Sequence, residues 1–197
     1  MSERMRRFES TGESKNEFLE SRIRISFRVA PEAQEYLPEI TKADLESGRE
    51  KYRLFLGRWS KSGDDADVSI DAIVEFDDDP RAVVEGVYEV QPDIGYMTAY
   101  IEELKRTNEE YRDLEIVGDI HTHPVFSDDM AEGVRPWDPS SGDIEDLVRQ
   151  YSSGHVRADR PFIFAIAAPH PNSDGETVYA YYHLFREDGV WKYRALK

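Results

Sequence analysis

The stretch that most constrains the fold is residues 118–124, which read Gly-Asp-Ile-His-Thr-His-Pro and follow the largely apolar run 114–117. Successive alternate residues of a β-strand project from the same face, so His121 and His123 point to one side. Pro124 follows directly and ends the strand, because proline has no N–H to donate to a sheet. The pattern predicts a strand that brings two imidazoles to one point.

A helix start that carries a carboxylate comes next in the chain. Ser140 and Asp143 have the spacing of a helix N-cap and its third residue, which by itself is explained by a capping box. The segment 124–139 is short enough to bring Asp143 back to the imidazoles. Two histidines and one carboxylate, with a fourth position open to water, are the ligand set of a catalytic zinc site. We therefore predict one Zn²⁺ bound by His121, His123 and Asp143.

Composition excludes several classes of protein. The net charge of -16 disfavours nucleic-acid binding, because phosphates require a basic surface. The chain has no cysteine, and therefore neither disulfides nor a cysteine-based zinc finger. We find neither an apolar run of membrane-spanning length nor a signal-peptide core. These features predict a cytoplasmic protein that binds neither nucleic acid nor membrane.

The hydrophobic pattern predicts a mixed α/β fold, in which a curved and mostly antiparallel sheet is flanked by helices. Residues 1–20 are polar and charged and are predicted to be disordered, and 21–197 form a single catalytic domain. Apolar periodicity gives the expected elements. Strands are expected over 22–28, 52–59, 68–76, 82–90, 114–123, 162–167, 178–185 and 190–196. Helices are expected from 31 onward, over 94–111 and over 140–151, and the first of them is expected either to kink or to restart at Pro38.

The paired histidines, Pro124, Ser140 and Asp143 together resemble the signature of the JAMM (MPN+, Mov34/MPN-type) zinc metalloproteases. The resemblance implies a JAMM/MPN-like fold with a cytidine-deaminase-like arrangement of layers. It also implies that His121, His123 and Asp143 bind zinc and that Ser140 stabilises the oxyanion of the reaction. Zinc lowers the pKa of a bound water from about 15.7 towards about 7, so hydroxide is available at neutral pH.

The family pattern also includes an upstream glutamate as general base, and the matching residue is Glu50, seven residues before Gly57. The inner glycine of the family motif is replaced here by Arg53. Glu50 is therefore assigned by register, and Glu46 and Glu75 remain alternatives. Asp119 and Asp138 are candidates for orienting a histidine ligand.

The segment between the second histidine and Ser140 is longer than in the family pattern and contains Phe126 and Trp137. These large apolar side chains lie among acidic residues, which is typical of a recognition surface. We predict that Phe126 and Trp137 contact substrate, in a segment that is either a lid or a surface insertion. His155, His170 and His183 are expected to be structural or exposed.

The predicted function is that of a zinc metallopeptidase. The resemblance implies an isopeptidase, similar to deubiquitinases, that cleaves after the C-terminal tail of a ubiquitin-like, β-grasp protein. The implied partners are that protein or its conjugates and E1- or E2-like proteins of the same pathway. Two alternatives stay open, a non-catalytic scaffold domain of the same fold and a metal-dependent hydrolase of small amides.

Overall fold

The computed structural model describes residues 23–76, 83–85, 90–124, 135–157, 159–170, 173 and 175–197. The predicted disordered segment 1–20 and Phe126 lie outside these residues. The described chain contains helices α1 (Pro31–Ser47), α2 (Ile94–Thr107) and α3 (Ser141–Ser153) and a short 3₁₀ helix η1 (Glu109–Tyr111). The strands are β1 (Arg24–Val29), β2 (Tyr52–Ser62), β3 (Asp65–Glu75), β4 (Val83–Glu85), β5 (Val90–Pro92), β6 (Glu115–Thr122), β7 (Ile163–Pro169), β8 (Thr177–Glu187) and β9 (Val190–Ala195).

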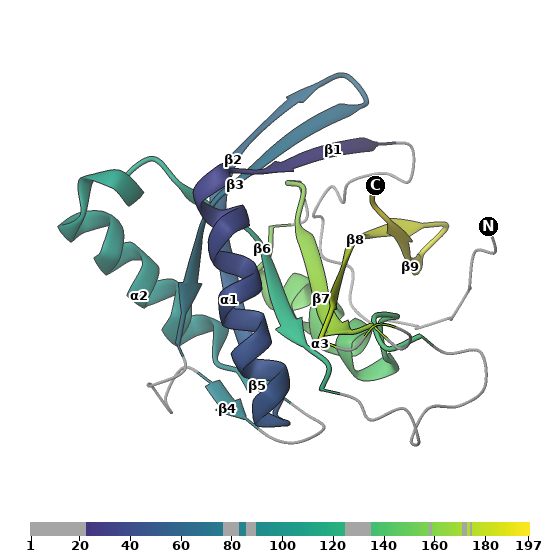
Figure 1. Ribbon diagram of the computed structural model, residues 1–197. Helices are drawn as coiled ribbons and strands as arrows, with labels where there is room; N and C mark the ends of the chain where they lie inside the picture. The colour runs from purple at the N-terminus through teal and green to yellow at the C-terminus, as the bar shows by residue number, and fades with distance from the viewer. Residues whose placement is uncertain are drawn as a thin grey trace.

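The main sheet is mixed and curled, with strand order β1-β3-β2-β6-β7-β8-β9, and Figure 1 shows its twist. β1 pairs with β3 and β6 pairs with β7 in parallel, whereas the other neighbours are antiparallel. β4 and β5 form a separate antiparallel pair. The prediction of a mixed α/β fold with a mostly antiparallel curved sheet is confirmed at this level.

Helices cover both faces of the sheet. On one face α1 buries Leu37 and Ile40 against Phe55, Ile70 and Ala165 of the strands beneath it. On the other face, one cluster joins α3 to β7, β8 and β9, and another joins α2 to β2 and β3. Because strands such as β7 are buried on both faces, they read in sequence as continuous apolar runs.

The strand β6 has an irregularity that decides which way its histidines face. The register with β2 shifts at Phe55, so that Ile116 and Gly118 pair with successive residues of β2 and Val117 is the extra residue of a bulge. After the bulge, Ile120 packs into the α1 side of the core. The alternate residues His121 and His123 therefore face the side of the sheet on which α3 begins.

Several local predictions differ from the structure. The single strand expected over 82–90 is wrong, since the structure has the short strands β4 and β5 there. Pro38 lies inside α1 without ending it. The second helix ends at Thr107 and is followed by η1, instead of reaching Tyr111 as one helix. The closing hairpin is confirmed, and its turn has positive φ at Asp188 and Gly189.

Within the described ranges, no helix combines the length and the apolar character that a membrane crossing requires.

Candidate metal centre

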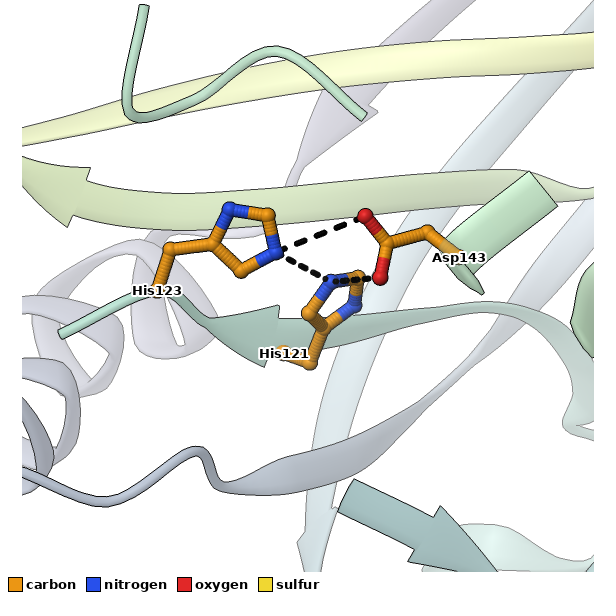
Figure 2. Close-up of side chains that lie close together, drawn as sticks. All are labelled: His121, His123 and Asp143. Carbon is orange, nitrogen blue, oxygen red and sulfur yellow. Dashed lines mark hydrogen bonds and ion pairs between the residues drawn. The ribbon is translucent and has the colours of Figure 1, made fainter. Parts of the chain in front are cut away.

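The side chains of His121, His123 and Asp143 converge where β6 ends and α3 begins (Figure 2). The two Nε2 atoms are 3.0 Å apart. The Asp143 carboxylate lies 3.2 Å from Nε2 of His121 and 3.5 Å from Nε2 of His123 through its two oxygens. Both histidines are buried, and Asp143 is partly buried. The structure thus brings together the three residues predicted as metal ligands.

The spacing of these atoms fits a metal ion. Zinc–ligand bonds are about 2.0–2.2 Å, so two ligands of a tetrahedral ion lie roughly 3.3–3.6 Å apart. The observed separations of 3.0, 3.2 and 3.5 Å come close to that range without rearrangement. Two imidazole nitrogens and a carboxylate also suit several other divalent metals. The group can therefore hold a metal ion, and the choice of zinc remains a prediction.

Hydrogen bonds outside the cluster orient two of the three side chains. Nδ1 of His123 lies 2.8 Å from the carbonyl oxygen of Pro136, which fixes the tautomer in which Nε2 carries the lone pair. The backbone N–H of Ser140 donates to Oδ2 of Asp143 at 2.6 Å. Such outer contacts hold a ligand ready before the metal arrives.

The capping box at Ser140 is present and does not compete with the metal centre. The Ser140 hydroxyl accepts from the Asp143 N–H at 3.1 Å, and the Asp143 carboxylate accepts from the Ser140 N–H. The same carboxylate still faces both imidazoles. The spacing of Ser140 and Asp143 is therefore explained both by a capping box and by a metal ligand, because the cap orients the Asp143 carboxylate towards the imidazoles. A hydroxyl that accepts one hydrogen bond keeps its proton to donate.

The charges of the cluster depend on one another. Burial disfavours a charged imidazole, but the Asp143 carboxylate outweighs it, with smaller effects of Asp119 and Glu50, and the pKa of His121 rises to about 9. Burial likewise opposes ionisation of Asp143, yet the two imidazoles hold the pKa of its carboxyl well below the usual range. Without metal, a proton on His121 balances the carboxylate, and a bound cation would replace that proton.

Of the two acids considered for orienting a histidine, only Asp119 lies inside the protein near the cluster. It is buried on β6, accepts from the Tyr52 hydroxyl at 2.6 Å, and interacts electrostatically with His121. Burial raises the pKa of Asp119 to about 7. Asp138 instead pairs with Arg135 at 2.7 Å. This arrangement favours Asp119 for the role.

The structure separates the three acids considered as general base. Glu50 is partly buried in the connection between α1 and β2, close enough to His121 for its charge to raise that pKa. Glu46 is exposed on α1 and lies 4.0 Å from Lys42. Glu75 accepts hydrogen bonds from Tyr36 and Arg53. Glu46 and Glu75 have partners away from the cluster, and of these three acids Glu50 is the one whose charge acts on His121.

Trp137 directly follows Pro136, whose carbonyl is the partner of His123, and it is only partly exposed. It packs against the core between α3 and the sheet, and its ring stacks on His170 with centroids 6.3 Å apart. Its carbonyl oxygen accepts from the Tyr182 hydroxyl at 2.7 Å. These contacts favour a structural role for Trp137, and substrate contact by Trp137 stays a prediction.

His155, His170 and His183 do not belong to the group of side chains that could hold a metal ion. His155 is exposed, whereas His183 is fully buried, where loss of hydration lowers its pKa to about 4. His155 lines a cavity of about 260 Å³ at the Glu115 end of β6, opposite the end that carries His121. The charged groups there are paired, as Arg160 is with Glu115 and Lys105 with Glu102.

Two residues near the site escaped the sequence prediction. Thr122, between the histidines, bonds to the segment that carries Glu50. Its position in the motif was a signal that it faces the opposite side of the strand. Arg53 looked like a departure from a motif, but it is a buried partner of Asp44. An arginine inside an apolar strand is a signal for a buried acid, although its partner is not evident from sequence.

Comparisons with known proteins leave the family open. No protein-family model matches the chain, and no curated protein matches it. Among solved structures, the chain is similar to the solution structure of protein DSY2949 from Desulfitobacterium hafniense, at 15% sequence identity and a TM-score of 0.47. The similarity covers 86% of this chain and 90% of that chain. A likeness at this level supports neither a family nor a function.

Proposed function

We propose that this protein is a zinc-dependent metallopeptidase of the JAMM type, with the layer arrangement of that family. One observation carries the proposal: His121, His123 and Asp143 converge at ligand spacing while Glu50 lies beside them. A capping box or a pair of structural histidines would account for part of this arrangement. Neither accounts for a further acid, Glu50, whose charge acts on a group of two buried imidazoles from the end of β6 and a carboxylate from the start of α3.

The chemistry assigned to the chain follows from where each group lies. A zinc ion held by the three ligands would polarise both the attacking water and the scissile carbonyl. Glu50 takes a proton from that water and passes it to the amine that leaves. The hydroxyl of Ser140 keeps a proton to donate towards the carbonyl oxygen as negative charge develops. Asp119 stabilises the orientation and charge of His121.

The substrate class rests on the sequence resemblance. It points to an amide bond that follows the C-terminal tail of a ubiquitin-like, β-grasp protein. Cleavage there frees a lysine amine or a processed tail. The protein's partners would be such a conjugate and the E1- or E2-like proteins that make it, in the cytoplasm.

The alternatives predict different behaviour. A non-catalytic scaffold has no use for a complete ligand set, whereas this chain keeps all three ligands and an adjacent acid. A hydrolase of small amides would share the metal centre and differ in substrate. Both alternatives are therefore separated from the proposal by activity measurements and not by metal content.

The test uses purified protein loaded with zinc and two substrates. One is a β-grasp protein whose C-terminal Gly-Gly is joined to a lysine side chain, and the other is a short acyl-lysine amide. We expect cleavage of the first, loss upon chelation, and recovery with zinc. Glu50→Gln should retain zinc and lose at least about 100-fold in rate. The exposed acid of α1 supplies the matched control, since Glu46→Gln should cleave normally.

Each contrary outcome has a distinct meaning. Zinc binding without cleavage of either substrate would favour the scaffold. Cleavage of the small amide alone would favour the small-molecule hydrolase. Normal activity of Glu50→Gln would remove Glu50 as the base.

A further inference from the structure

Thr122 lies between the two histidines but on the other face of β6, where it is 1% exposed. Its side chain therefore cannot join the metal ligands. The hydroxyl instead reaches the connection between α1 and β2, which carries Glu50. A buried hydroxyl in this position needs hydrogen-bond partners, and all of them come from that connection.

Thr122 forms hydrogen bonds with the backbone of both neighbours of Glu50, Arg49 and Lys51. Its Oγ1 accepts from the Lys51 N–H at 2.9 Å and lies 3.4 Å from the carbonyl oxygen of Arg49, to which it donates. Its backbone N–H donates to the Lys51 carbonyl at 3.0 Å. The peptide groups that precede and follow Glu50 are thus both hydrogen-bonded to Thr122, the residue between His121 and His123.

A second contact holds the same connection from its far ends. Arg53 of β2 and Asp44 of α1 form a bidentate, buried ion pair with distances of 2.5 and 3.0 Å. Helix α1 ends between them, at Gly48 with φ 68°. The chain from Asp44 to Arg53 is therefore a closed loop with Glu50 near its middle. The ion pair at its ends and the hydrogen bonds to Thr122 restrain the backbone on both sides of Glu50.

We propose that Thr122 is a positioning residue whose hydroxyl fixes Glu50 relative to the two histidines. The inference rests on the proposed function, in which Glu50 is the general base. Proton transfer requires heavy atoms within about 2.6–3.2 Å, so a displacement of 1 Å is enough to cost about 100-fold in rate. A hydroxyl that holds both neighbouring peptide groups prevents such a displacement without touching the substrate.

The experiment compares Thr122→Val, which keeps the shape of the side chain and removes the hydroxyl, with Thr122→Ser, which keeps the hydroxyl. In Thr122→Val the zinc content should stay at the wild-type level, because no ligand changes. We expect kcat to fall about 10- to 100-fold with KM unchanged, and Thr122→Ser to regain most of the loss. A role in folding alone would lower the amount of folded protein and leave kcat of the folded fraction unchanged.

Two measurements by NMR report on the geometry without any turnover. The Lys51 amide, which donates to Oγ1, should exchange with solvent at least about tenfold faster in Thr122→Val than in wild type. With cobalt(II) as the probe at the metal centre, the pseudocontact shifts of the Glu50 side chain should shrink in Thr122→Val and return in Thr122→Ser.

The kinetic and NMR measurements together separate failure of the inference about Thr122 from failure of the proposed function. Wild-type values of kcat, Lys51 exchange and Glu50 pseudocontact shifts in Thr122→Val would overturn the inference and leave the metallopeptidase intact. If wild type cleaves neither substrate, the proposed function fails, and the exchange and cobalt data decide alone whether Thr122 holds Glu50.

Discussion

Two buried polar clusters lie on neighbouring strands and differ in how their charges are balanced. The first joins Arg53 to Asp44 and Glu75, and we call it the ion-pair cluster. The second is the metal cluster, His121, His123 and Asp143. In the ion-pair cluster a permanent cation meets its carboxylates directly. In the metal cluster, acceptor atoms face each other, and only a proton or a metal ion can balance them.

The difference indicates which cluster is structural. A buried charge is tolerated when it is paired, and the guanidinium with its fork of N–H donors satisfies Asp44 within the protein. A group of lone pairs that face one another is unfavourable unless a cation enters. We therefore expect the ion-pair cluster to matter for folding and the metal cluster to matter for ligand binding. The predictions below test that division.

The largest effect on stability is expected for Arg53→Ala. The substitution leaves Asp44 buried without its cation, and breaking a buried pair from one side costs about 3–5 kcal/mol. Urea unfolding of the metal-free protein measures the loss. Arg58→Ala on the same strand is the matched control, because its pair with Asp71 is exposed and should contribute below about 1 kcal/mol. Equal losses in the two variants would contradict the comparison.

Zinc should stabilise the protein only through the metal cluster. At a free zinc concentration of 100 times Kd, the gain in the free energy of unfolding is about 2.7 kcal/mol. Asp143→Ala should lose this gain and most of the bound zinc, as found by elemental analysis after gel filtration. Glu145→Ala on the same helix removes an exposed acid and should behave as wild type. A zinc-dependent gain that survives in Asp143→Ala would remove this residue as a ligand.

Much of this arrangement follows from local sequence pattern, and the rest does not. The face shared by His121 and His123 follows from strand alternation, and the cap at Ser140 follows from helix chemistry. The carbonyl of Pro136 as the partner of His123 has no sequence signal, because any residue offers a carbonyl. The bulge at Val117 was equally hidden, since it depends on how two strands meet.

The other features that the sequence did not predict depend on which helices and strands meet in the folded protein. Arg53 and Asp44 are close in sequence but come from different elements, so their contact follows only once α1 is placed on the sheet. The comparison of Glu50 with Glu75 likewise depends on tertiary structure. In the structure Glu75 accepts hydrogen bonds from Arg53 and Tyr36, whereas the charge of Glu50 acts on His121, and this contact with the cluster supports Glu50 in the proposed role.

The pH dependence of the metal-free protein should show which cluster titrates near neutrality. The pKa of His121 is about 9 in the folded state and near 6.5 in the unfolded state. The protonated imidazole therefore adds fully to the free energy of unfolding below about pH 6.5, and this stabilisation is lost as the pH rises towards 9. The pKa of Asp119, raised by burial to about 7, acts in the same direction, because its folded form also holds a proton more tightly.

We therefore expect metal-free protein in chelator to lose on the order of 2 kcal/mol in unfolding free energy between pH 6 and pH 9.5. Urea midpoints at the two pH values measure the change. Saturating zinc should remove the part due to His121, because the metal replaces the proton. A midpoint that rises with pH in the metal-free protein would contradict the assigned charges.

The smallest effect on stability is expected for Ser140→Ala, where helix cap and metal cluster meet. The variant loses the hydroxyl that accepts from the Asp143 N–H, which costs about 1 kcal/mol. It keeps the backbone N–H that holds the Asp143 carboxylate, so its zinc content should equal that of wild type. Ser141→Ala, one residue further along the exposed helix start, is the control and should lose less. If Ser140→Ala loses its zinc, the hydroxyl and not the backbone orients Asp143. If it retains both zinc and full turnover, Ser140 serves the helix alone, because an oxyanion donor would cost about 100- to 1000-fold in rate.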